Sequence, residues 1–280
     1  MSASHEKLDD WLGKEVVTED DITAFPLAAM AATLDRTENG DTVPPLWHWL
    51  YFLPTAPLSE VGPDGHPRRG GFLPPVPLPR RMWAGGRLTF HAPLKVGERA
   101  KRTSTIANID DKTGRAGRLV FVTVQHAIEA NGELKLEEEH DIVYRDAPQE
   151  GARPPHPALA PEGETWRRTI DADAVMLFRY SALTFNGHRI HYDYPYVTQV
   201  EGYPGLIVHG PLMATLLVDL VRREQPDATL QSFAFKAVRP TFAGQPFTVC
   251  GKPSADGKTV DLWAKDHEGY LTMSAAATLA

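Results

Sequence analysis

The segment NGHRIHYDYP, residues 186–195, combines histidine, arginine, aspartate and asparagine side chains that could carry out chemistry. His191 can take up and release a proton near neutral pH, because the unperturbed pKa of imidazole is about 6.5. The order His191-Tyr192-Asp193 also matches two ligands of an iron site made of two histidines and a carboxylate. The segment therefore allows three interpretations: an acid–base site, a metal site or a polar turn.

The metal interpretation requires a second, more distant histidine. His209 follows too soon to leave room for an intervening sheet, and no arginine follows His267 to bind the carboxylate of a co-substrate. The single cysteine, Cys250, excludes a disulfide within the chain and a cysteine-rich zinc site, and it favours a reducing compartment. We therefore expect neither a metal nor another cofactor, and iron is the disfavoured alternative.

Two halves of similar element order must position this segment. In the first half, apolar spacing predicts a helix at 19–35, an apolar helix or tight run at 45–54, and strands at 86–92, 100–109 and 118–130. In the second half it predicts helices at 171–184 and 209–224 and strands at 231–240, 246–252, 258–265 and 270–279. The segment 186–195 then lies on the loop between the last two helices.

A short sequence match supports an internal duplication. The strings FHAPLKVGE and AVRPTFAGQ align Pro93 with Pro240 and Gly97 with Gly244. Together with the matching element order, this alignment predicts a tandem α+β protein in which antiparallel sheets pack against helices.

The boundary between the halves is predicted from proline content. The segment 148–164 is too rich in proline to form a regular helix or a central strand, and we interpret it as a linker. The predicted modules are then residues 1–147 and residues 165–280.

The string from 181 to 214 resembles a known family, the MaoC-like hydratases and dehydratases of acyl thioesters. The hallmark of that family is tyrosine or phenylalanine, then glycine-aspartate-x-asparagine-proline-aliphatic-histidine, followed later by histidine-glycine at the start of a central helix. With the hallmark histidine placed on His191, Asn186 stands at the aspartate, and the pair His209-Gly210 stands at the helix start. The departure at Asn186 shifts acid–base work onto the histidine.

The form FNGHRIHYD is similar to a subgroup, the mesaconyl-CoA hydratases and the hydroxyacyl-thioester dehydratases type 2, and residues 79–97 resemble its first half. The resemblance implies a double hotdog fold, in which each of two modules wraps a curved antiparallel sheet around a long central helix. It also implies reversible hydration of a short enoyl-CoA, such as the dicarboxylic mesaconyl-CoA.

Catalytic roles follow from the resemblance and from side-chain chemistry. His191 is the predicted acid–base group, and Asn186, whose amide does not titrate, is expected to orient the water. Asp193 is expected to fix the tautomer of His191, to carry a second proton, or to cap the following turn. Free N–H groups at His209 and Gly210 are expected to bind the thioester oxygen.

Basic residues are candidates for binding the substrate. Arg189 and His188 are expected to face a substrate carboxylate or to fix the loop by hydrogen bonds. Candidates for the phosphates of coenzyme A are Arg80, Arg81, Lys236 and Arg239.

The first half carries an aromatic cluster where the second carries its histidines. The cluster contains Trp47, Trp49, Tyr51 and Phe52, with His48 as its one acid–base candidate. We therefore expect this half to be non-catalytic and to shape the acyl pocket.

The net charge of −7 at pH 7 argues against a nucleic-acid partner or an anionic membrane surface. No apolar stretch approaches the roughly 18 residues that span a membrane, and the acidic N-terminal segment lacks a secretion signal. We expect a cytoplasmic protein, a monomer or homodimer, that binds an acyl-CoA of which coenzyme A is part. The alternatives are a hotdog thioesterase and a catalytically silent acyl-CoA-binding protein.

Overall fold

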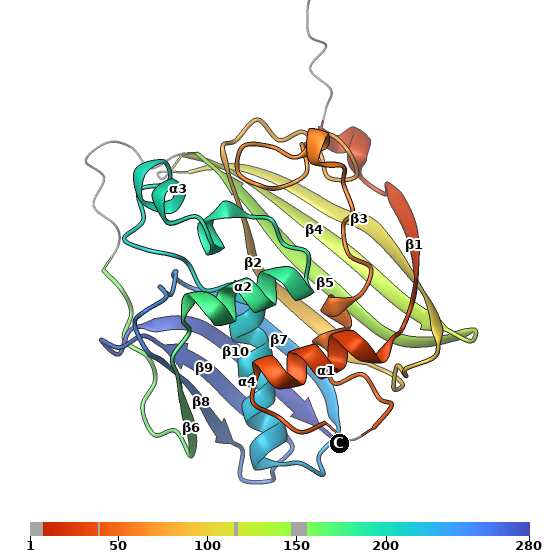
Figure 1. Cartoon of the computed structure of the whole chain (residues 1–280), viewed down its shortest axis with the longest axis vertical. Helices are drawn as coiled ribbons and strands as arrows, with labels where there is room; N and C mark the ends of the chain where they lie inside the picture. The colour runs from red at the N-terminus through yellow and green to blue at the C-terminus, as the bar shows by residue number, and fades with distance from the viewer. Residues whose placement is uncertain (1–7, 39, 115–116, 147–155) are drawn as a thin grey trace, which may run out of the picture.

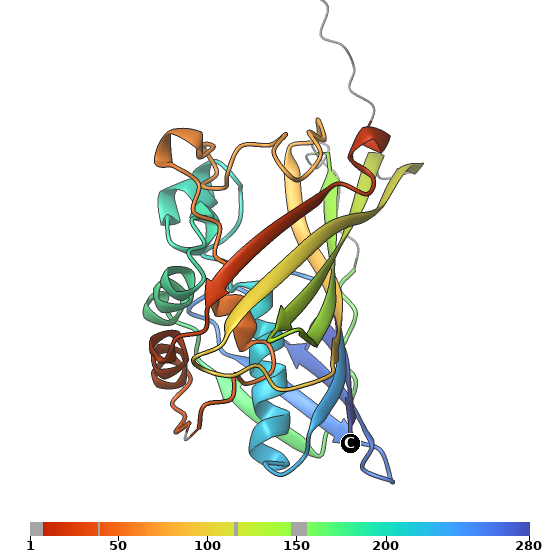
Figure 2. The same cartoon turned by 90° about the vertical axis from the view of Figure 1, so that its right-hand side faces the viewer.

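The computed structural model describes residues 8–38, 40–114, 117–146 and 156–280. Within these residues, ten strands form one antiparallel sheet, and helices cover one of its faces (Figures 1 and 2). The strands are β1 (Glu15–Asp21), β2 (Arg80–Phe90), β3 (Arg99–Gly114), β4 (Gly117–Ala130), β5 (Glu133–Arg145), β6 (Trp166–Ile170), β7 (Leu230–Ala237), β8 (Phe247–Pro253), β9 (Thr259–Lys265) and β10 (Leu271–Leu279). The α-helices are α1 (Ala24–Thr33), α2 (Ala174–Leu183), α3 (Tyr194–Gln199) and α4 (Gly210–Glu224).

The strand order repeats from each edge of the sheet to its centre. The first half contributes β1, β3, β4, β5 and β2, and the second half contributes β6, β8, β9, β10 and β7 in the same relative order. The two halves meet where β2 pairs antiparallel with β7. Because β2 and β7 are equivalent strands, their antiparallel pairing relates the halves by an approximate two-fold axis.

The predicted match of two glycines is confirmed at the level of single hydrogen bonds. Gly97 and Gly244 both adopt a positive φ, 91° and 79°, which glycine tolerates without strain. The N–H of Gly97 donates to the carbonyl of Ile22, and the N–H of Gly244 donates to that of Ala172. Since Ile22 and Ala172 stand just before α1 and α2, the same turn fastens the same helix in each half.

The long helix α4 lies against the sheet of the second half, contacting β6, β8, β9 and β10 (Figure 2). Ten consecutive residues, from Leu212 to Val221, are buried, so the helix is enclosed on all sides. This burial explains its nearly continuous apolar sequence. No helix among the described residues, α4 included, is long and apolar enough to cross a membrane.

The expectation of a long central helix in each half is wrong for the described part of the first half. Its place in the sequence holds a single 3-10 turn, η2 (Trp47–Leu50). Prolines at 44, 45 and 54 confine the apolar run, and Leu46 turns the chain with a φ of 69° just before η2. In the first half, a loop therefore stands where the second half has its long helix. The inner face of β3, β4 and β5 is thus not covered by a long helix among the described residues.

The predicted linker at 148–164 falls partly outside the described residues. In its described part, Leu159 forms a β-bridge with Tyr270, and the N–H of Ala160 donates to the carbonyl of Gly269. The end of this segment is thus bound to the turn between β9 and β10.

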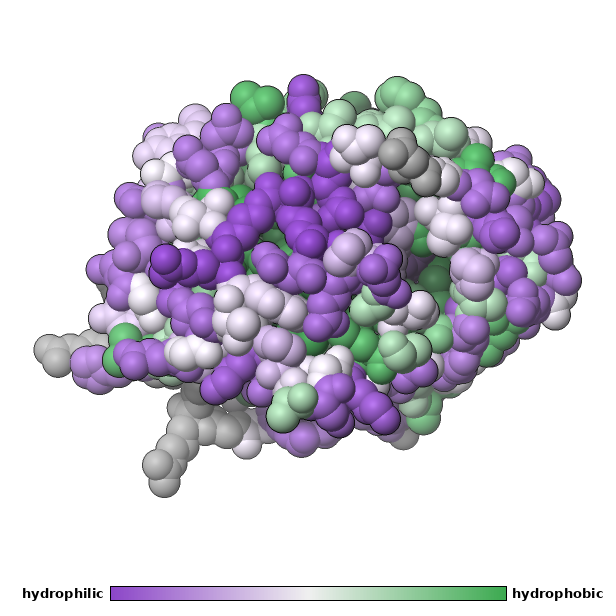
Figure 3. Space-filling view, turned by 90° about the horizontal axis from the view of Figure 1, so that it is seen from below, coloured by the Kyte–Doolittle hydropathy of each residue, from purple (hydrophilic) through white to green (hydrophobic). Residues whose placement is uncertain are grey.

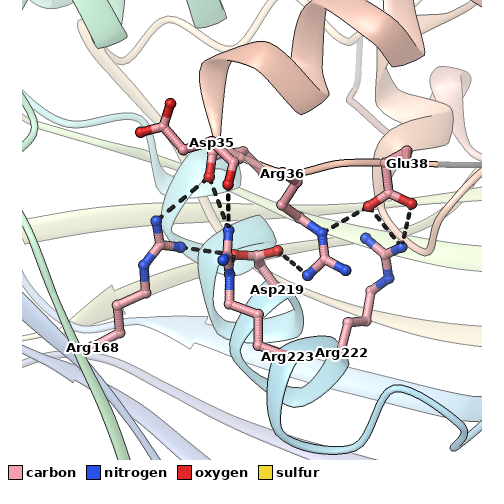
Figure 4. A network of polar contacts seen from close by, with 8 residues as sticks. Asp35, Arg36, Glu38, Arg168, Asp219, Arg222 and Arg223 are labelled. Atoms are coloured by element: carbon pink, nitrogen blue, oxygen red, sulfur yellow. Dashed lines mark hydrogen bonds and ion pairs between the residues drawn. The ribbon is translucent and has the colours of Figure 1, made fainter.

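A buried carboxylate on α4 joins the two halves (Figure 4). Asp219, whose side chain is fully buried, accepts from Arg36 at 2.7 Å, from Arg168 at 2.8 Å and from Arg223 at 2.7 Å. Because Arg36 belongs to the first half and Arg168 to β6, one carboxylate fastens α4 to both modules.

A second ion pair extends this network toward the end of α4. Glu38 pairs with Arg36 at 2.7 Å and with Arg222 at 2.9 Å. Strongly hydrophilic residues gather near the centre of the face at the lower end of Figure 1, where α4 ends, with apolar residues around them (Figure 3). The lower end of the helix is thus held by charge, whereas its middle is held by apolar packing.

Candidate active site

The loop after α2 turns twice before α4 begins. Its first turn is the 3-10 helix η4 (Arg189–His191), and its second is α3. Asp193 starts α3, because its side chain accepts the N–H of Tyr196 at 3.1 Å. As a result, His191 is buried while Tyr192 and Tyr194 stay exposed.

The tautomer of His191 is fixed by the backbone. Its Nδ1 lies 2.7 Å from the carbonyl oxygen of Ile207, which can only accept, so the ring proton is on Nδ1. The Nε2 atom is therefore unprotonated and can accept a proton. Burial lowers the pKa of His191 to about 4, which keeps the ring neutral near pH 7.

His209 packs directly on this ring. The two imidazoles are stacked, with centroids 3.6 Å apart and planes at 18°. Nε2 of His209 lies 2.8 Å from the hydroxyl oxygen of Ser181 on α2, and its buried Nδ1 has no hydrogen-bond partner among the described residues. Burial and the neighbouring His191 hold the pKa of His209 well below its usual range, so His209 is a neutral ring that supports His191.

The start of α4 lies beside these rings. His209 occupies the cap position, and Gly210 is the first residue of the helix. A β-carbon at Gly210 would meet no heavy atom within 4 Å beyond its chain neighbours and the backbone of α4. The first N–H groups of a helix lack partners within the helix and carry partial positive charge. The open space at Gly210 thus adjoins donors that suit a developing oxyanion.

Asn186 is occupied mainly by its own loop. Its Oδ1 accepts the N–H of His188 at 3.0 Å, which is a local turn formed by the side chain. Its role in orienting a water stays a prediction.

For Asp193 and Arg189 the structure shows the alternatives that fix the loop: Asp193 caps the following turn, and Arg189 forms hydrogen bonds within the loop and to the first half. The carbonyl of Ile207, not Asp193, fixes the His191 tautomer, and Asp193 is bound to Arg189 at 2.7 Å while capping α3. Arg189 also donates to the carbonyl of Pro63 at 2.9 Å and lies over the ring of Tyr196. Both residues therefore fix the loop, since their polar atoms already have partners.

The same contacts argue against the iron alternative. A site of this type would need His191 and Asp193 to bind one ion, yet the carboxylate of Asp193 is bound to Arg189 and caps α3. Neither His209 nor His267 forms a potential metal cluster with them in the part of the chain that the structure describes.

A hairpin from the first half, residues 61–67, contacts this loop, and the sequence analysis missed it. His66 lies against His188, with ring centroids 4.1 Å apart, and His188 lies 5.5 Å from His191. Nδ1 of His66 is 3.0 Å from Oδ2 of Asp64. The string PDGHP offers a turn signal but no sign of its partner, because the contact joins residues 126 positions apart in the sequence.

The predicted phosphate-binding residues do not form one patch. Arg80 donates to the carbonyl of Glu201 at 3.2 Å, and Arg239 pairs with Asp266 at 3.0 Å. Lys236 is exposed on β7, on the face opposite the buried Phe235. Arg81, on β2, differs from these three, because its charge adds to the effect of burial in lowering the pKa of His66 and of His188.

The inner face of the first half carries a buried polar cluster. Glu138, 2% exposed, accepts from the ring N–H of Trp49 at 2.9 Å and lies 3.2 Å from Nε2 of His48 and 3.1 Å from Nε2 of His140. Burial alone would raise the pKa of Glu138, but the two histidines hold it well below its usual range. In the second half, β10, the counterpart of β5, instead buries the apolar residues Met273, Ala277 and Leu279.

Comparison with known proteins gives concordant results. A family model for hydroxyacyl-thioester dehydratase type 2 matches residues 46–243. The mesaconyl-C(4)-CoA hydratase of Chloroflexus aurantiacus is 47% identical over 276 residues, which cover 96% of this chain and 96% of that protein.

Solved structures agree on the fold. A MaoC-like dehydratase from Phytophthora capsici superposes with a TM-score of 0.74 at 13% identity over 98% of each chain. A Mycobacterium tuberculosis protein described as a double hotdog superposes with a TM-score of 0.55 at 13% identity over 96% of each chain. The predicted α+β double hotdog fold is confirmed.

Proposed function

The chain belongs to the hydroxyacyl-thioester dehydratase type 2 family, and from this premise we propose that it reversibly hydrates a short enoyl-CoA whose acyl group carries a second carboxylate. The observation that carries the proposal is His191: a neutral imidazole with a free Nε2, beside the open start of α4. The mesaconyl-CoA named for the Chloroflexus relative is an acyl group of this class.

The chemistry follows from these two features. Nε2 of His191 accepts a proton from water as the water oxygen bonds to the β-carbon of the thioester. The π electrons move to the thioester oxygen, where the N–H of Gly210 at the start of α4 stabilises the charge, since the next residue, Pro211, has no N–H. The α-carbon then takes up the proton, and the reverse sequence is dehydration. Coenzyme A enters as part of the substrate, and we propose no other cofactor.

Arg81 is the residue that we propose for the second carboxylate. It belongs to β2, opposite Tyr144 on β5, and its charge acts on both His66 and His188. A guanidinium can bind a carboxylate through two parallel hydrogen bonds. This assignment replaces Arg189, which Asp193 already occupies.

The first half is proposed to enclose the acyl group. Trp83 follows Arg81 on β2 and contacts both Trp49, at 5.0 Å between ring centroids, and His140, at 4.1 Å. Aromatic rings and the polar cluster at Glu138 thus lie together on the inner face of the first half. A pocket of this composition suits a short polar acyl group better than a long alkyl chain.

One chain contains both modules, and we propose that it forms a complete active unit. Cys250 is buried, which agrees with a reducing compartment, and we propose the cytoplasm.

The loss of enoyl-thioester absorbance tests the function directly. Purified protein is mixed in parallel with mesaconyl-CoA, itaconyl-CoA and crotonyl-CoA, with a chelator and a thiol reagent in matched samples. We expect the fastest loss with mesaconyl-CoA and no release of free thiol. Release of thiol would instead indicate a thioesterase, and binding without any absorbance change would indicate an acyl-CoA-binding protein.

The variant His191→Asn tests the proposed base. The asparagine NH2 group can still donate to the carbonyl of Ile207, but asparagine offers no titrating nitrogen in place of Nε2. We expect kcat to fall about 100- to 10,000-fold with little change in melting temperature. Near-native turnover in a folded His191→Asn protein would exclude this mechanism.

A further inference from the structure

We propose that the Asp64–His66 pair of the first half completes the active site and takes over the task of the acidic residue that position 186 lacks. This inference rests on the proposed function, because it assigns residues that support His191 in the same reaction. Asp64 and His66 act through His188 and are therefore positioning residues.

The hairpin at 61–67 is fastened to the catalytic loop by its backbone. The N–H of Arg189 donates to the carbonyl of Asp64 at 2.9 Å, and the Arg189 side chain donates to the carbonyl of Pro63 at 2.9 Å. A β-carbon at Gly65 would lie 1.8 Å from the carbonyl oxygen of Gly187. The two segments thus approach as closely as glycine allows, and they come from different halves.

Within the hairpin, Asp64 determines the tautomer of His66. Oδ1 of Asp64 accepts the backbone N–H of His66 at 3.1 Å, and Oδ2 accepts the ring Nδ1–H at 3.0 Å. Burial alone would raise the pKa of Asp64, but its bonds to His66 hold it well below the usual range, so the carboxylate is ionised. His66 therefore presents an unprotonated Nε2, as His191 does.

The four histidines form a continuous row. His66 contacts His188, His188 meets His191 edge to face, and His191 stacks on His209. Asp64 is the carboxylate at the outer end of this row. Burial lowers the pKa of His188 to about 2, and burial likewise lowers that of His66, despite the opposing effect of Asp64. Arg81 and Arg69 add positive charge beside the row.

A proton on this row requires stabilisation. During hydration, water gives a proton to His191 while its oxygen bonds to the β-carbon, and the α-carbon later receives the proton, so the enzyme ends unchanged. In between, the row must hold one extra positive charge near two arginines, with His191 and His209 buried and His66 and His188 half-buried. The Asp64 carboxylate is placed to offset that charge through its hydrogen bond to His66.

A divalent metal is the competing explanation, because ligand atoms of Asp64, His66 and His188 all lie within 4.8 Å of one another. However, Oδ2 of Asp64 already accepts a hydrogen bond from Nδ1–H of His66, and the charges of Arg81 and Arg69 oppose a further cation. Charge and hydrogen bonding therefore favour a proton over a metal.

The variant Asp64→Asn tests the inference with minimal disturbance. Asparagine keeps the oxygen that accepts the N–H of His66, so the turn persists, but its NH2 group cannot accept the ring proton. We expect kcat for hydration to fall about 10- to 100-fold, with KM within about two-fold of wild type. Glu60→Gln, an exposed carboxylate in the preceding turn, is the matched control and should keep wild-type kcat.

Chemical rescue separates a charge role from a purely structural one. We expect formate to restore part of kcat in Asp64→Ala in a saturable manner, and to leave wild type and Glu60→Gln unchanged. Wild-type kcat in folded Asp64→Asn, or a stoichiometric metal whose removal abolishes activity, would overturn the inference. If wild type hydrates none of the three thioesters, the proposed function itself fails, which is a different result.

Discussion

A single backbone carbonyl determines what His191 can do. Because the carbonyl oxygen of Ile207 accepts a hydrogen bond from Nδ1–H at 2.7 Å, the opposite nitrogen is left as a proton acceptor, and no carboxylate is needed to fix the tautomer. His209 stacks on the ring of His191, and its own Nε2 forms a hydrogen bond with the hydroxyl of Ser181. The base is thus prepared by packing and by the backbone.

The pH dependence of hydration should reveal this environment. The pKa of His191 is lowered to about 4, and its protonated form cannot accept a proton from water, so kcat/KM should fall as pH decreases through about 4 and stay level above it. The neutral ring also favours the folded state, a contribution that is complete above about pH 6.5 and declines as pH falls toward about 4.

Circular dichroism at each pH separates loss of activity from unfolding. An acid limb near pH 6.5 in folded protein would show that His191 is not desolvated in the free enzyme.

Sequence motifs predicted which single residues can do chemistry better than they predicted which residues those side chains contact. The order around His191 and His209-Gly210 was sufficient to place an imidazole beside a helix start. Arg189 and Asp193 were also candidates for the site from their residue types. They pair with one another instead, because their spacing of four residues across a tight turn brings the two side chains together. The pair at Asp64 and His66 lay outside any motif, and only the fold brings it to the loop.

At the scale of elements, the start of α4 is the part of the site that a substrate must reach. Its first residue, Gly210, faces open space, and the helix behind it is buried from Leu212 to Val221. A rigid helix therefore presents its N–H groups at a fixed position.

Gly210→Ala should block this position without unfolding the protein. Alanine has a higher helix propensity than glycine, and its β-carbon would meet no other group in the free enzyme. The melting temperature should therefore stay equal or rise slightly. We expect kcat/KM to fall at least about 10-fold, because the added methyl group occupies the path of the thioester. A variant with native kcat/KM would show that the substrate does not approach the start of α4.

There are physical reasons why some elements could not be predicted from the sequence. All seven predicted strands are present, but β1, β5 and β6 were missed. Charged residues occupy most of β1 and lie on both faces of β5, where Lys135 and Glu138 are buried, so neither strand shows a clear alternation, while β6 is only five residues long. The long helix expected in the first half is absent from its described part because prolines limit the apolar run around η2 to one turn.

At the scale of the whole molecule, the sheet and one buried carboxylate join the halves. The β2–β7 pairing makes the sheet continuous, and Asp219 binds arginines from both modules. The duplication was predictable from Gly97 and Gly244, which mark equivalent turns, but the network at Asp219 was not, since its members are scattered along the chain.

Asp219→Ala should destabilise the protein strongly. The change leaves Arg36, Arg168 and Arg223 without their shared acceptor, and we expect the free energy of unfolding to fall by about 3 kcal/mol or more. The control Arg87→Ala removes an exposed ion pair with Glu139 and should cost less than about 1 kcal/mol. Urea denaturation of both variants measures the difference, and equal losses would contradict the structural role of Asp219.

The antiparallel seam between β2 and β7 also bears on ancestry. A symmetric dimer of identical polypeptides would pair two equivalent strands in this way. Such a dimer would contain two equivalent catalytic centres. Once both copies were encoded by a single gene, selection could treat them separately. One copy could then lose its long helix and become a pocket wall, which leaves the fused enzyme with one working centre and a partner shaped to serve it.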